Sequence, residues 1–76
     1  MITLYSTGCP KCKILEKKIE DSNISYIKID NIEEMLSLGI EEVPVVKLEN
    51  GKLLNFMTCN LLLNEKGENA FNEVDL

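Results

Sequence analysis

The chain carries the stretch Gly8-Cys9-Pro10-Lys11-Cys12 near its amino terminus, between a short apolar segment and a charged segment with helical periodicity. A helix that begins here has Cys9 as its N-cap and Pro10 at its first position, where no intrahelical hydrogen bond is lost. The positive end of the helix dipole then favours a thiolate at Cys9. Cys12 lies one turn later on the same face and can close a disulfide with Cys9. This arrangement is typical of a dithiol redox site.

Composition limits the classes of protein to consider. The 76 residues are enough for one domain, 1–76, and the net charge is −5 with no arginine, which argues against a nucleic-acid or anionic-membrane partner. No apolar run approaches the roughly 18 residues of a membrane span. Because Met1 leads straight into a strand-like segment and the three cysteines are an odd number, we expect neither a signal peptide nor a secreted disulfide framework. We therefore expect a cytoplasmic monomer.

Periodicity predicts four elements in the first half of the chain. Ile2–Tyr5 alternates as a strand does, and 11–21 has the spacing of an amphipathic helix that ends near Asn23, a good left-handed residue. The segment 24–29 is rich in strand-forming residues. A second, short helix follows, capped by either Asp30 or Asn31 and stopped by Gly39.

The second half of the chain predicts a hairpin and a last helix. Strands are expected at 43–48 and 52–56, joined by the turn signal Asn50-Gly51. Thr58 is the expected N-cap of a helix over 59–66. Residues 68–76 form either a loose turn through Phe71, Val74 and Leu76 or a frayed tail. The order β-α-β-α-β-β-α predicts an α/β fold with one mixed four-stranded sheet flanked by helices.

Three motifs together resemble a glutaredoxin. They are Leu4-Tyr5-Ser6-Thr7-Gly8-Cys9-Pro10-Lys11-Cys12, then Val43-Pro44-Val45-Val46 about thirty residues later, then the Asn50-Gly51 hairpin. The resemblance covers residues 1–66, is closest to short glutaredoxin-like redoxins of low-GC bacteria and their phages, and implies the minimal thioredoxin fold.

The resemblance also implies roles for individual residues. Cys9 is then the nucleophile of a thiol–disulfide oxidoreductase and Cys12 the resolving thiol, acting on protein or small-molecule disulfides. Pro44 corresponds to a cis-proline that faces the dithiol, and Val43 offers its backbone to an extended substrate. The remaining expected substrate contacts are Thr7, Pro10 and Lys11.

The chain departs from the glutathione-using members at one stretch. Their Gly-Gly pair is replaced by Asn55-Phe56-Met57-Thr58-Cys59, and no arginine is present to pair with a glutathione carboxylate. The electron donor is therefore either glutathione or a thioredoxin reductase. No tightly bound cofactor is expected.

Other interpretations of the same residues stay open. Cys9 and Cys12 are alternatively structural cysteines or ligands of a metal or of an iron–sulfur cluster shared between chains, since one chain has only three cysteines and no histidine. Cys59 is expected to be a small helix residue, with regulatory oxidation as the alternative. Glu41-Glu42 is either a solvated face or a partner-selecting patch beside Pro44.

Overall fold

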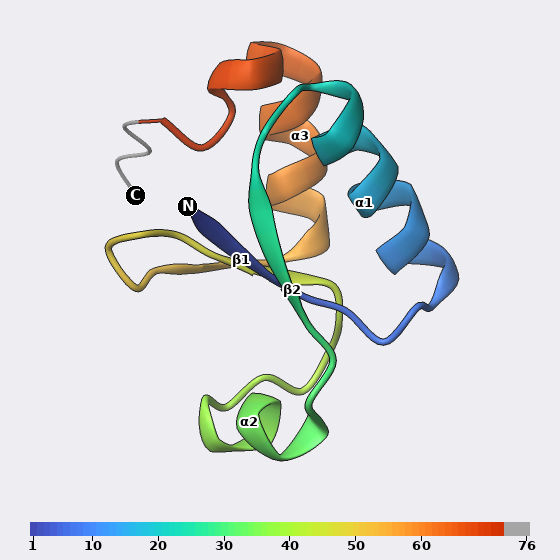
Figure 1. Ribbon diagram of the computed structural model, residues 1–76, viewed down its shortest axis with the longest axis vertical. Coiled ribbons are helices and arrows are strands. Elements are labelled where there is room, and N and C mark those ends of the chain that lie inside the picture. The colour runs from blue at the N-terminus through green and yellow to red at the C-terminus, as the bar shows by residue number, and fades with distance from the viewer. Residues whose placement is uncertain (73–76) are drawn as a thin grey trace.

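Strand β1 (Ile2–Tyr5) lies at the centre of the computed structural model, which describes residues 1–72. The sheet has the order β2-β1-β3-β4 (Figure 1). β2 (Tyr26–Ile29) runs parallel to β1, whereas β3 (Val45–Lys47) is antiparallel to β1 and β4 (Leu53–Leu54) is antiparallel to β3. The predicted mixed four-stranded sheet is confirmed, and so is the predicted order of its elements.

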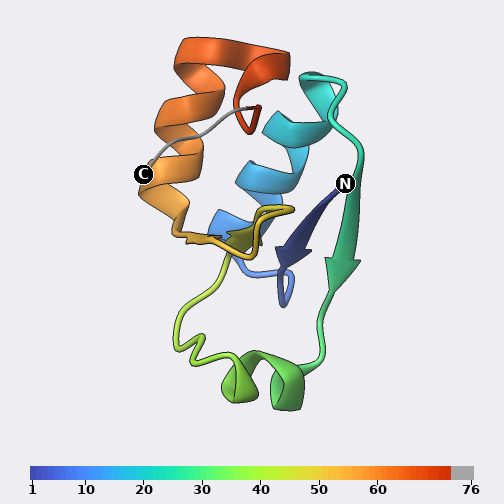
Figure 2. The same ribbon diagram turned by 90° about the vertical axis from the view of Figure 1, so that its left-hand side faces the viewer.

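α1 (Pro10–Asp21) and α3 (Phe56–Lys66) lie side by side on one face of this sheet, and α2 (Ile32–Ser37) lies apart from them, beyond the carboxyl ends of β1 and β2 (Figure 2). Side chains alternate along β1, so Ile2 and Leu4 pack with α1 and α3 while Tyr5 packs with Met35 of α2. The larger core cluster, on the α1 and α3 side, comprises Ile2, Leu4, Leu15, Ile19, Val46, Leu48, Leu54, Cys59, Leu63 and Ala70.

α1 begins and ends where its sequence predicts. Cys9 is the N-cap, and Cys12, Leu15 and Ile19 form the buried face. Asn23 has a φ of 59°, and the N–H of Ile24 donates to the Ile19 carbonyl over 3.2 Å, which closes the helix end. Because the Ile24 N–H is used in this way, β2 starts at Tyr26 and the predicted start at residue 24 is wrong.

Turn residues set the bounds of α2 and of the hairpin. Of the two candidate caps, Asn31 is the one that acts, since its side chain accepts the Glu34 N–H over 3.0 Å. Gly51 has a φ of 89°, and the Leu48 N–H donates to the Lys52 carbonyl over 2.8 Å to close the predicted hairpin. β3 is shorter than predicted and begins at Val45, after Pro44, which has no N–H to give to a ladder.

α3 begins earlier than predicted. Asn55 is its N-cap and accepts the Thr58 N–H over 2.9 Å, so the helix starts at Phe56. The prediction of Thr58 as the cap is therefore wrong, and the fourth strand is limited to β4 because the chain is already turning at Asn55.

The chain stays on the core after α3. Gly67 opens a 3₁₀ turn, Gly67–Asn69, with a φ of 56°; Ala70 is fully buried and Phe71 packs against the larger cluster. Residues 68–72 are therefore not the loose tail considered above, while Val74 and Leu76 lie outside the described residues. No helix within residues 1–72 combines the length and the apolar character needed to cross a membrane.

Candidate dithiol site

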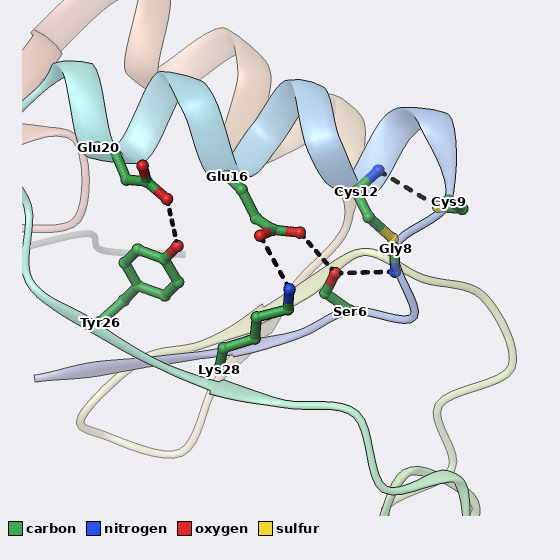
Figure 3. A network of polar contacts seen from close by, with 8 residues as sticks. All are labelled: Ser6, Gly8, Cys9, Cys12, Glu16, Glu20, Tyr26 and Lys28. Carbon is green, nitrogen blue, oxygen red and sulfur yellow. Dashed lines mark hydrogen bonds and ion pairs between the residues drawn. The ribbon is translucent and has the colours of Figure 1, made fainter.

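Cys9 occupies the junction between the β1–α1 loop and the helix. Its backbone is extended, with φ −66° and ψ 166°, and its Sγ accepts the N–H of Cys12 over 3.2 Å (Figure 3). Its side chain is partly exposed. A sulfur at this point faces the unsatisfied N–H groups of the first turn, which stabilise negative charge. The predicted placement of Cys9 as the N-cap is confirmed.

Cys12 lies behind Cys9 and is fully buried, and both cysteines are free thiols. Burial raises the pKa of the Cys12 thiol, but hydrogen bonds with the side chains of Cys9 and Ser6 and with the Thr7 backbone outweigh it, so the pKa lies below its ordinary value of 9.0. The Cys12 thiol therefore ionises more readily than an ordinary thiol although it is buried.

The Val43–Pro44 segment lies next to Cys9. The Val43–Pro44 peptide bond is cis, as predicted, and Pro44 is fully buried. The Val43 carbonyl accepts a hydrogen bond from the Cys9 thiol over 3.9 Å. Segments more than thirty residues apart in the sequence thus meet at Cys9.

A groove of about 260 Å³ runs along Val43-Pro44. It brings together three of the predicted substrate contacts, Lys11, Val43 and Pro44, whereas Thr7 and Pro10 are exposed and lie outside its lining. The Lys11 ammonium lies 5.6 Å from the centre of the Phe56 ring, which also lines the groove. Sequence analysis noted Phe56 only as a departure and placed it in a strand; its role as a wall follows from the early start of α3.

Glu41 and Glu42, which sequence analysis considered as a solvated face or as a patch beside Pro44, also line the groove. Sequence analysis missed a second group of polar residues. Beneath the dithiol, Ser6 is fully buried and donates to Glu16 over 2.9 Å, and the Lys28 ammonium pairs with the other oxygen of Glu16 at 3.1 Å (Figure 3). A signal existed for Glu16, which is four residues after Cys12 and so on the same side of the helix.

Cys59 is separate from the dithiol. It is fully buried in α3, its thiol donates to the Leu54 carbonyl over 3.8 Å, and burial raises its pKa to about 12. Sequence analysis expected a small, half-buried helix residue; Cys59 is in the helix but fully buried. Within residues 1–72 no three Cys, His, Asp or Glu side chains gather as a metal site requires. A cluster shared between two chains stays a prediction, testable by the colour and metal content of anaerobically purified protein.

The comparisons with known proteins add no relative. No family model, no curated protein and no solved structure matches this chain.

Proposed function

We propose that this protein is a thiol–disulfide oxidoreductase of the glutaredoxin type, built on the minimal thioredoxin fold. One observation carries the proposal: a partly exposed sulfur, Cys9, caps the N-terminus of α1, with the buried Cys12 thiol one turn behind it. Structural cysteines do not need a helix N-terminus, whereas a nucleophilic sulfur gains from it. The groove beside Cys9 gives a disulfide substrate a place to bind.

The reaction proceeds in two exchanges. The Cys9 thiolate attacks one sulfur of the substrate disulfide, and the other substrate sulfur leaves with the electron pair of the broken bond. Cys12 then attacks Cys9, forms the Cys9–Cys12 disulfide and releases the second substrate thiol. The substrate gains two electrons, and the dithiol is oxidised by the same two electrons.

Substrate orientation depends on the backbone of Val43. This residue precedes β3, whose ladder with β1 begins at Val45, and its carbonyl already lies beside Cys9. An extended peptide that pairs with Val43 therefore runs along the groove with its disulfide at Cys9.

Variants of the three cysteines test the proposal. Cys9→Ser is expected to abolish reduction of a protein disulfide such as insulin, because the other two thiols, Cys12 and Cys59, are buried. Cys12→Ser is expected to stop turnover after the first exchange. Cys59→Ala is the matched control and is expected to keep its activity. Full activity in Cys9→Ser would refute the proposal.

We propose a protein reductase, and not glutathione, as the electron donor. Glutathione is anionic, and the groove presents Glu41 and Glu42 against one lysine, Lys11. Coupling the oxidised protein separately to thioredoxin reductase and to glutathione with its reductase, and following NADPH consumption, distinguishes the two donors. Faster recharging by glutathione would reverse this assignment.

A further inference from the structure

The outer face of α3 is apolar although it is exposed. Cys59 and Leu63 on the inner face are buried in the larger core cluster, whereas Met57 and Leu61 on the outer face are 77% and 57% exposed. Met57 and Leu61 lie four residues apart, so they are neighbours on the helix surface. A helix that is apolar on both faces is usually covered on both faces. The outer face of α3 thus has the character of a binding surface.

A hollow of about 400 Å³ lies on this face of α3. Its described lining residues, none of them charged, are Phe56, Met57, Thr58, Asn60, Leu61 and Asn64. The Lys18 ammonium donates to the side-chain oxygens of Asn60 and Asn64, in the second case over 3.1 Å. Because the protein itself uses these two oxygens, the surface left for a ligand is mainly that of Met57 and Leu61. The chemistry of the hollow therefore favours large apolar side chains.

The hollow continues the groove that runs along Val43-Pro44. Phe56 is the one described residue common to the linings of the groove and the hollow. Leu61 lies five residues along α3 from Phe56, which is about 7.5 Å, a length that about two or three extended residues span. A peptide that pairs with Val43 and runs past Phe56 therefore meets the hollow directly after the groove.

Charge divides this combined surface into two parts. Glu41 and Glu42 line the groove, directly before Val43 in the sequence, and neither of them lines the hollow. Lysine side chains of a substrate are attracted to the acidic part, whereas apolar side chains gain from burial in the hollow. The two preferences thus belong to different segments of the same bound peptide.

We propose that the hollow on α3 is a second binding site for the disulfide substrate, which takes large apolar side chains close to the reactive cysteine. This role rests on the proposed oxidoreductase function and names its substrate class. The preferred substrate has lysines on one side of its reactive cysteine and leucine-like side chains on the other. Phe56, with the Lys11 ammonium 5.6 Å from its ring centre, lies at the border between the two parts of the surface.

Chromogenic peptides test the hollow. Each peptide carries one cysteine in a mixed disulfide with thionitrobenzoate, and attack by Cys9 on the peptide sulfur releases the coloured thiolate. One peptide has two lysines on one side of its cysteine and two leucines on the other, and both orders are made. In the reference peptides two serines replace the leucines. In the faster order, wild-type protein is expected to react about tenfold faster with the leucine peptide than with its serine reference.

Substitutions on two helices locate this preference. In the double variant Met57→Gln, Leu61→Gln the ratio of the leucine-peptide rate to the serine-peptide rate is expected to fall to about two or less. Because the ratio compares two peptides on one protein, a change at the dithiol itself cancels. Ile32→Gln, Leu36→Gln on α2 is the matched control, since these side chains are 54% and 65% exposed and line neither the groove nor the hollow. This control is expected to keep the wild-type ratio.

The rate ratios also define the results that would overturn the proposal. These are a wild-type ratio near one, an unchanged ratio in Met57→Gln, Leu61→Gln, and an equal fall in the two double variants. Sedimentation of wild-type protein as a dimer that Met57→Gln, Leu61→Gln dissociates would assign the hollow to a second copy of the chain instead. Failure of the proposed function looks different, because wild-type protein would then release thiolate from every peptide no faster than Cys9→Ser does.

Discussion

The three cysteines differ in what surrounds each sulfur. Cys9 is partly exposed and accepts a backbone N–H at a helix N-terminus. Cys12 is buried but contacts polar groups, and Cys59 is buried among apolar side chains of the larger core cluster. Reactivity follows these environments, since a thiolate needs donors or solvent. These environments fit the roles proposed above: Cys9 as the nucleophile, Cys12 as the resolving thiol and Cys59 as an inert core residue.

The environment of Cys59 predicts an alkaline loss of stability. Burial raises its pKa from 9.0 to about 12, so the stabilising contribution is complete below pH 9. As the pH rises from 9 towards 12, the unfolded chain loses a proton that the folded chain keeps, and the free energy of unfolding falls. Urea titrations at pH 8 and pH 10 measure this fall. In Cys59→Ala the free energy of unfolding is expected to differ less between the two pH values than in the wild type. An equal difference would show that Cys59 is not the cause of the fall.

Helix ends explain both the success and the errors of sequence analysis at the level of elements. α1 was predicted to within a residue, because Cys9, Pro10 and Asn23 each have a strong positional preference. The predicted start of α3, at residue 59, is three residues later than its observed start at Phe56. Thr58 and Asn55 are both acceptable caps, and only the packing of Phe56 against the core selects between them. The local preferences of the residues alone therefore do not specify which of the two caps the helix.

The cap of α3 gives a stability prediction. Asn55→Ala removes the acceptor of the Thr58 N–H and is expected to lower the free energy of unfolding by about 1 kcal/mol. Thr58→Ala retains the backbone N–H and is the matched control, expected to change stability by less than about 0.5 kcal/mol. Chemical denaturation measures the free energy of unfolding of the two variants and of the wild type. A larger loss in Thr58→Ala than in Asn55→Ala would show that Thr58 is the cap after all.

At the scale of the whole molecule, the sheet joins segments that the sequence keeps apart. The motifs predicted Cys9, Cys12 and Pro44 as one site, and the fold brings them together around Val43. Ser6, Glu16 and Lys28 were not predicted, because their meeting depends on the register that places Lys28 beside Leu4. Such a network follows from strand pairing, which periodicity does not specify.

The charge of the molecule predicts substrate selection. With a net charge of −5 and Glu41 and Glu42 in the groove, a disulfide peptide flanked by lysines is expected to react several-fold faster than its glutamate-flanked counterpart at low salt. High salt is expected to reduce the ratio of these two reaction rates. Replacing both Glu41 and Glu42 by Gln should lower the ratio of the two peptide rates. The same replacement of Glu65 and Glu68, a pair of equal charge outside the groove lining, should lower it less. An equal decrease of the rate ratio in the two double variants would contradict a role of the groove in substrate selection.

The position of the first covalent bond to a substrate identifies the nucleophilic sulfur. Cys12→Ser protein is mixed with a disulfide peptide, quenched with acid, digested and analysed by mass spectrometry. We expect a stable mixed disulfide on Cys9, and none on Cys9→Ser protein treated in the same way. A peptide attached to Cys59, or no adduct on Cys9, would contradict the assignment of the sulfur at the start of α1 as the nucleophile.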